Sequence, residues 1–202
     1  MRLSAFTYYA DYVVFPTGAV ALSAAGAVSV SRADLPYWGL ALLGGMILWP
    51  LLEYVLHRWV FHRLAPIRQM HEAHHQKSTA LIGTRWWISL PLVAVLALLP
   101  ASLIMGFGTA AGFTSGLMLG YTGYMLVHHG VHHWSSKSGT FFDRLKRRHV
   151  LHHRFDARGD YDQGNYGVVT GFWDRVFGTD LGMGPIAVRR ARGDSQDAAG
   201  GG

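Results

Sequence analysis

The sequence contains no cysteine, which excludes disulfide bonds, iron–sulfur clusters and zinc sites built from thiolates. It is also poor in charge, since Asp, Glu, Lys and Arg make up only 15% of its residues, against about 25% in a typical soluble domain. Hydrophobic residues make up 50% of the chain. Any metal bound here must therefore be held by histidine or carboxylate side chains, and the shortage of charge indicates a membrane protein.

Three long stretches carry no charged side chain: residues 12–31, 35–52 and 86–136. A helix that crosses a bilayer needs about 20 apolar residues, so the third stretch is long enough for a hairpin of two helices. Gly106 and Gly108 mark its turn, because glycine readily adopts the backbone angles of a tight turn. We predict an all-α membrane protein with four transmembrane helices, near residues 12–31, 36–56, 86–105 and 108–127.

The positive charges fall almost entirely on one side of this arrangement. With four spans, the N-terminus, residues 57–85 and everything after residue 127 share one side, which carries every Lys and Arg except Arg32. Positively charged loops mark the cytoplasmic face, so topology and lipid headgroup contacts account for the net charge of +6. We therefore expect an integral membrane protein that binds no nucleic acid, in the inner membrane of a bacterium or the endoplasmic reticulum of a eukaryote.

The length of 202 residues suits one domain. We expect a single integral membrane domain over residues 1–185, with a cytoplasmic helical cap formed by residues 57–85 and 128–185. The basic tail at residues 186–202, rich in Gly and Ala, is predicted to be disordered.

All twelve histidines lie on the predicted cytoplasmic side, in four clusters. The clusters are His57 and His62; His71, His74 and His75; His128, His129, His132 and His133; and His149, His152 and His153. Residues at i, i+3 and i+4 share one face of a helix, and two histidines at i, i+4 are a recurrent metal-chelating arrangement. His57 and His62 are five residues apart and point away from each other on a regular helix. Either that helix breaks near the membrane surface, or the two side chains serve different metals.

About ten histidine ligands exceed what one metal accepts, since tetrahedral zinc takes four. The number fits two metals with four or five nitrogens each. Imidazole binds Zn, Cu, Fe and Ni, so the ligands alone do not name the ion. The four histidines of the third cluster offer two i, i+4 pairs, and the spacing does not decide between them.

These clusters resemble the fatty acid hydroxylase / sterol desaturase superfamily of membrane di-iron enzymes. The superfamily pattern is His-x4-His, His-x2-His-His, His-x3-His, His-x2-His-His. It is met here by His57/His62, His71/His74/His75, His128/His132 and His149/His152/His153. Within the superfamily the fatty acid 2-hydroxylases look most similar, on Glu53-Tyr54 before the first cluster and Tyr121 and Tyr124 before the third. Asn165-Tyr166-Gly167 and Trp173-Asp174 resemble the C-terminal signature of the broader superfamily.

The resemblance implies a helical cap that carries a histidine-rich di-metal site. The implied ligands are His57, His62, His71, His74, His75, His128, His132, His149, His152 and His153, with His129 and His133 as alternatives. It implies two iron ions, which zinc can replace in a purified sample, and O₂ as co-substrate. Asn165 and Asp174 are expected to hydrogen-bond to the ligating histidines and orient their rings. Tyr124 and Trp59 are expected to line a substrate cavity beneath the histidines.

The implied reaction is hydroxylation of a C–H bond in a lipid acyl chain. The cytochrome b5 domain fused to many eukaryotic 2-hydroxylases is not found in these 202 residues, so electrons are expected from a separate donor of the ferredoxin or cytochrome b5 type. His128 and His133 also satisfy the His-x4-His spacing of bacterial carotenoid hydroxylases. A carotenoid ring hydroxylase and a sterol desaturase or hydroxylase are therefore the alternatives, and a metal-binding membrane protein without oxygenase activity is a third.

Overall fold

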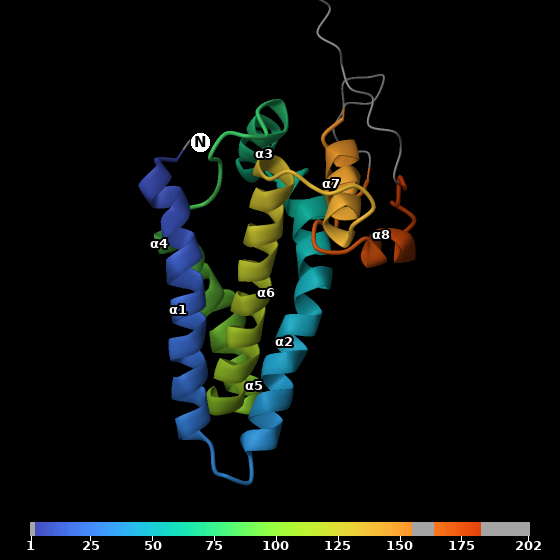
Figure 1. The fold of residues 1–202 in the computed structure, drawn as a ribbon. Coiled ribbons are helices and arrows are strands. Elements are labelled where there is room, and N and C mark those ends of the chain that lie inside the picture. The colour runs from blue at the N-terminus through green and yellow to red at the C-terminus, as the bar shows by residue number, and fades with distance from the viewer. Residues whose placement is uncertain (1–2, 155–163, 183–202) are drawn as a thin grey trace, which may run out of the picture.

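The long helices stand side by side, with α6 between α1 and α2, and the short helices α3 and α7 lie at one end of this bundle (Figure 1). The computed structural model describes residues 3–154 and 164–182. The elements in order are α1 (Ala5–Ser29), α2 (Leu35–Val55), the π-helix η1 (Leu56–Phe61), α3 (Ile67–Gln76), α4 (Trp86–Val93), the π-helix η2 (Ala94–Leu98), α5 (Leu99–Met105), α6 (Phe107–His133), α7 (Phe141–His152) and α8 (Phe172–Val176). The predicted tail at residues 186–202 lies outside the described residues.

Three helical segments are long and apolar enough to cross a bilayer: Ala5–Ser29, Leu35–Phe61 and Trp86–Met105. The largely helical fold and these three candidate spans agree with the prediction. The predicted fourth span, 108–127, lies within α6, which does not meet the same criterion of hydropathy among the described residues. The reason is its composition, because α6 is rich in Gly, Ser, Thr and Ala and buries many of these small residues against its neighbours.

Small residues allow α2 and α6 to approach until their backbones touch. A Cβ atom on Gly45 of α2 would lie 2.1 Å from the carbonyl oxygen of Phe113, and one on Gly116 of α6 would lie 2.0 Å from that of Leu42. Such contacts between small residues are typical of helix packing in membranes. They hold α2 and α6 against each other, and α6 carries His128 and His132 while α2 continues into η1, which carries His57.

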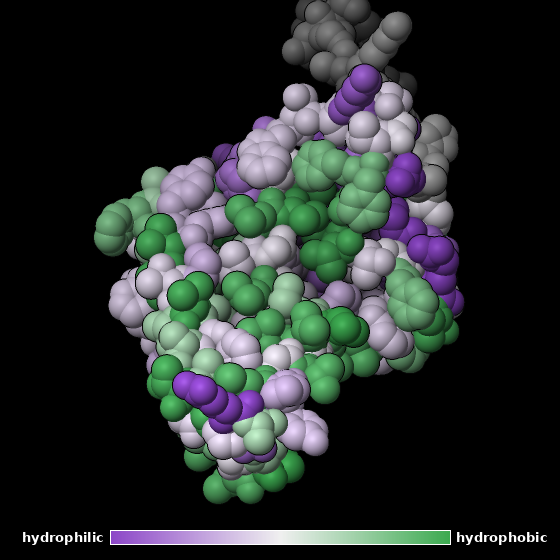
Figure 2. Space-filling view, turned by 60° about the horizontal axis from the view of Figure 1, so that its bottom comes forward, coloured by the Kyte–Doolittle hydropathy of each residue, from purple (hydrophilic) through white to green (hydrophobic). Residues whose placement is uncertain are grey.

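The outward faces of the candidate spans are apolar. Val20 of α1, Ile47 of α2 and Leu103 of α5 are exposed by 65%, 76% and 81%. Apolar side chains lie over much of the face turned to the viewer in Figure 2. An apolar surface of this extent needs a partner, and a bilayer provides one along the whole length of the bundle.

The turn between α5 and α6 is as tight as predicted. Gly106 ends α5 with a φ of 78°, and α6 begins at the next residue. A positive φ is accessible to glycine without steric cost. The segment from α4 to α5 therefore folds back directly on α6, and α6 returns the chain to the end of the bundle that holds α3.

Candidate metal centre

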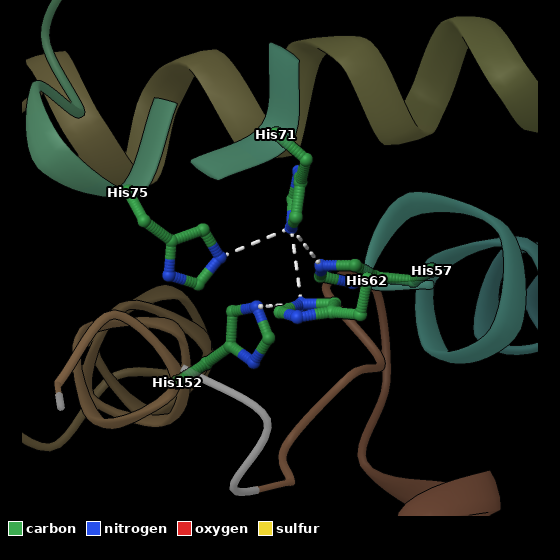
Figure 3. Close-up of side chains that lie close together, drawn as sticks. All are labelled: His57, His62, His71, His75 and His152. Carbon is green, nitrogen blue, oxygen red and sulfur yellow. Dashed lines mark hydrogen bonds between the residues drawn. The ribbon is translucent and has the colours of Figure 1, made fainter. Parts of the chain in front are cut away.

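Ten histidines converge into two groups of five at the end of the bundle. Site A consists of His57, His62, His71, His75 and His152; site B consists of His74, His128, His132, His149 and His153. Within each group the ligand nitrogen atoms all lie within 4.8 Å of one another. Figure 3 shows the rings of site A turned toward one another from η1, α3 and α7.

The ring nitrogens are spaced like ligands of one ion. In site A, His71 Nε2 lies 2.9 Å from His57 Nε2, 3.1 Å from His62 Nε2 and 3.0 Å from His75 Nε2. Two nitrogens at right angles on an ion, each about 2.1 Å from it, are separated by about 3.0 Å. An imidazole nitrogen carries one proton or one lone pair, so His71 cannot satisfy three facing nitrogens by hydrogen bonding alone. A shared cation satisfies all of them, and the site is compatible with a metal.

Site B repeats this spacing. His149 Nε2 lies 2.8 Å from His132 Nε2 and 3.0 Å from His153 Nε2, while His74 Nε2 lies 3.1 Å from His128 Nε2. The distances fall in the same range as in site A. Each group thus offers five imidazole nitrogens to one centre, which is the upper of the two numbers expected from the sequence.

The π-helix η1 explains how His57 and His62 reach the same site. The backbone N–H of His62 donates to the carbonyl of His57, 3.3 Å away, which is the i→i+5 bond of a π-helix. Residues five apart are therefore one turn apart, and both rings face His71. The sequence suggested a broken helix or two different metals; the structure shows a continuous helix with a wider turn instead.

Helices α3 and α7 each lie between the two sites and supply both. On α3, His71 and His75 share one face and enter site A, while His74 enters site B. On α7, His149 and His153 enter site B, while His152 enters site A. Neighbouring residues on a helix point about 100° apart, so each His-x2-His-His motif divides its rings between two centres.

The third cluster divides cleanly. His128 and His132 belong to site B, whereas His129 and His133 belong to neither group. The rings of His129 and His133 stack on each other with centroids 4.2 Å apart, and His129 Nδ1 lies 3.1 Å from the hydroxyl of Tyr8. His129 therefore packs against α1 and not into site B, and His133 stacks on it.

Main-chain carbonyls orient two rings of site A. His57 Nδ1–H donates to the carbonyl of Tyr166, and His152 Nδ1–H donates to that of Gly164 at 2.8 Å. A carbonyl can only accept, so both rings carry their proton on Nδ1 and present the Nε2 lone pair to the site. A bond of this kind behind a metal-binding histidine fixes its tautomer and orientation.

Asn165 and Asp174, predicted to orient the rings, hydrogen-bond to backbone groups instead of to the histidines. The Asp174 carboxylate accepts from the N–H groups of Tyr166 and Gly167, at 2.8 and 3.0 Å. Asn165 adopts a φ of 53°, and its side chain accepts from Leu181 N–H and donates to the Arg148 carbonyl. Within the described part of the chain, neither side chain bonds a histidine; they hold the backbone whose carbonyls do.

Glu53 is a further buried group near site A whose role the sequence does not reveal. Its side chain is 3% exposed and accepts from the backbone N–H groups of Val168 and Val169. Residues 164–169, which we call the carbonyl loop, are thus held by both Glu53 and Asp174. A carboxylate one turn before His57 in an apolar helix was the available signal, but its partners lie more than a hundred residues away in the chain.

Tyr124 and Trp59, both predicted to line a substrate cavity, lie in different surroundings. The Tyr124 ring stacks on His128 of site B with centroids 5.5 Å apart and also contacts Trp49 and Tyr121. Trp59 packs instead against Tyr54 and Phe177, at the junction of η1 and the end of α8. Tyr124 therefore lies directly against a site, whereas the contacts of Trp59 give it a packing role.

Burial keeps the histidines that α3 and α7 bring to the sites neutral. Together with repulsion from neighbouring imidazoles, it lowers the pKa of His74 to about 4 and that of His152 to about 3. Burial also lowers the pKa of His71, His149 and His153. A neutral imidazole is the form that binds a metal, so these rings are available as ligands at neutral pH.

A helical bundle with apolar candidate spans and ten clustered histidines defines a class of membrane proteins with a two-centre histidine site. A family model described as fatty acid hydroxylase matches residues 42–179. The chain belongs to the fatty acid hydroxylase family, as its histidine pattern predicts.

The chain is similar to several characterised members. It is 32% identical to dihydroceramide fatty acyl 2-hydroxylase FAH2 of Arabidopsis thaliana, over 77% of this chain and 67% of that protein. It is 29% identical to fatty acid 2-hydroxylase of Rattus norvegicus, over 67% of this chain but only 38% of the rat protein. A solved structure of full-length scs7p, with only the hydroxylase domain visible, matches 87% of this chain and 67% of that chain, with a TM-score of 0.69 and 26% identity.

Proposed function

We propose that this protein is an O₂-dependent oxygenase that hydroxylates a C–H bond of a lipid acyl chain at a di-iron site. The observation that carries the proposal is the convergence of ten histidines, in the family's spacing, into two groups of five nitrogens. The relatives named fatty acyl 2-hydroxylase and fatty acid 2-hydroxylase support an acyl chain as substrate. Iron is proposed because oxygenation of a C–H bond requires a redox-active metal and zinc has no redox chemistry.

The proposed topology places α6 as the fourth span and sites A and B on the cytoplasmic face. Its support is that α6 has 27 residues, enough to cross a bilayer, and packs along α1 and α2. The distribution of Lys and Arg supports the orientation. In this proposal residues 1–185 form one domain, whose cap brings the ten histidines to the membrane surface.

Bound iron would supply the activation of O₂ needed for an unactivated C–H bond. The chain's own residues hold and orient the ligands and exclude water. Tyr124, stacked on His128, and the buried Trp49 close site B on the side that faces the bundle. An acyl chain entering from the bilayer would contact these two side chains. Electrons would come from a separate ferredoxin- or cytochrome b5-type donor.

The division of the third cluster favours an acyl substrate over a carotenoid. The carotenoid hydroxylase spacing requires His128 and His133 as a pair, but His133 lies outside both sites and is exposed. The His128 and His132 pair that enters site B has the spacing of the fatty acid hydroxylases. A sterol desaturase shares this spacing, so the product decides between those two reactions.

The proposal is tested by metal analysis together with lipid analysis. Protein purified under reducing, iron-replete conditions is expected to hold two metal ions per chain and to consume O₂ with a suitable electron donor. Lipids of cells that express the gene should gain the mass of one oxygen on acyl chains. Fewer than two metals per chain, or zinc with no O₂ consumption under any donor, would contradict the oxygenase; oxygen gained on carotenoids alone would support the carotenoid alternative.

A further inference from the structure

The two sites differ in the hydrogen-bond partners of their Nδ1 atoms, the ring nitrogens that do not face the proposed ion. In site A, the carbonyl loop receives the Nδ1–H groups of His57 and His152. In site B, the Nδ1 atoms of His74, His149 and His153 are buried without a hydrogen-bond partner among residues 3–154 and 164–182. Among the described residues, three of the five rings of site B thus lack an Nδ1 hydrogen bond of the kind that two rings of site A make.

Two buried carboxylates hold the carbonyl loop of site A. Glu53 accepts from Val168 and Val169 N–H, and Asp174 accepts from Tyr166 and Gly167 N–H. Glu53 is 3% exposed and Asp174 is fully buried, at 0%. The two side chains thus accept from four consecutive N–H groups of the loop, Tyr166 to Val169, and fix its position. Movement of the loop would move both carbonyls behind site A.

We propose that the two metal positions are unequal: site A retains its ion, site B exchanges its ion readily, and Glu53 is the positioning residue that causes the difference. The inference rests on the proposed two-metal function. Partners behind metal-binding histidines contribute roughly 10- to 100-fold in metal affinity. The ion in site B should therefore leave roughly 10- to 100-fold faster than the ion in site A.

The first test uses Zn²⁺ as the probe in the purified full-length protein. After loading to two ions per chain, excess chelator is added and the metal that remains bound is measured over time by mass spectrometry. Loss in two phases of one ion each, separated by roughly 10- to 100-fold in rate, is expected. Loss of both ions in one phase would overturn the inference, while failure to load two ions would count against the two-metal proposal itself.

Assignment of the phases uses His153→Ala, which removes a ligand of site B alone. This variant should lack the fast phase and lose its remaining ion at the slow rate. Retention of the fast phase and loss of the slow one would mean that site A is the labile position. The thermal unfolding of the metal-free variant is recorded to show that it folds like the parent.

The role of Glu53 is tested with Glu53→Met. The substitution keeps the length of the side chain but removes the oxygen that accepts from Val168 and Val169 N–H. The slow phase should accelerate about 10-fold while the fast phase keeps its rate. The matched control is Glu72→Met, because Glu72 is half-buried and pairs with Arg68 on α3, and both phases should remain unchanged. Equal acceleration of both phases by Glu53→Met would mean that the residue supports the fold and not site A.

Discussion

Replacing His152 with alanine is expected to abolish hydroxylation and to lower the metal content from two ions per chain to one. His152 is fully buried, its Nε2 lies 3.2 Å from His62 Nε2, and its Nδ1–H donates to the carbonyl of Gly164. The substitution removes one of five nitrogens of site A and leaves that carbonyl without its donor. Membrane insertion should be unaffected, because the apolar spans form without metal.

The matched control for this variant is His133→Ala. His133 is exposed and belongs to neither site, although the sequence alone offered it as a ligand of the third cluster. Product analysis in cells, with metal analysis of the purified protein, should show parental activity and two ions for His133→Ala. Retained hydroxylation in His152→Ala, or its loss in His133→Ala, would contradict the division of the histidines described above.

Replacing Gly45 with alanine is expected to separate α2 from α6. The added Cβ would lie 2.1 Å from the Phe113 carbonyl oxygen and 2.9 Å from Leu117 N, both backbone atoms that no side-chain rotation can move. Overpacking of this kind costs about 1–3 kcal/mol. Because α2 leads into His57 and α6 carries His128, the separation should also weaken metal binding at sites A and B.

The adjacent Gly44→Ala is the control, since a Cβ there meets no atom within 4 Å. An exposed helical Gly→Ala change stabilises by up to about 1 kcal/mol. Thermal unfolding in detergent should therefore show a lower midpoint for Gly45→Ala than for the parent and an equal or higher one for Gly44→Ala. Equal midpoints in the two variants would mean that the close approach of α2 and α6 is not needed for stability.

Spacing along the chain was sufficient to predict the i, i+4 pairs that act together on a helix. His71 with His75 and His149 with His153 illustrate this directly. Spacing did not predict the division of each His-x2-His-His motif, because i, i+3 and i+4 were expected to share one face, whereas His74 and His152 enter the other site. The pairing of His57 with His62 could not be derived in the same way, since it depends on a π-turn that a regular helix does not contain. An x4 spacing between two ligands of one ion is itself the signal for such a turn.

Features that depend on distant backbone were not predictable from the sequence. The carbonyls of Gly164 and Tyr166 carry no side-chain signature, so Asn165 and Asp174 were expected in their place. The hydropathy criterion also fails for α6, because a helix enclosed by other helices can be built from small residues without large apolar ones. In both cases the determining contacts join segments that lie far apart in the chain.

Each half of the chain supplies histidines to both sites, so the two halves depend on each other for metal binding. Residues up to Gln76 supply four histidines to site A and one to site B, and residues from Phe107 onward supply four to site B and one to site A. If the chain were cut between α3 and α4, neither fragment would own a complete site. A site with all five nitrogens would form only after the fragments associate, so each bound ion would link the two fragments.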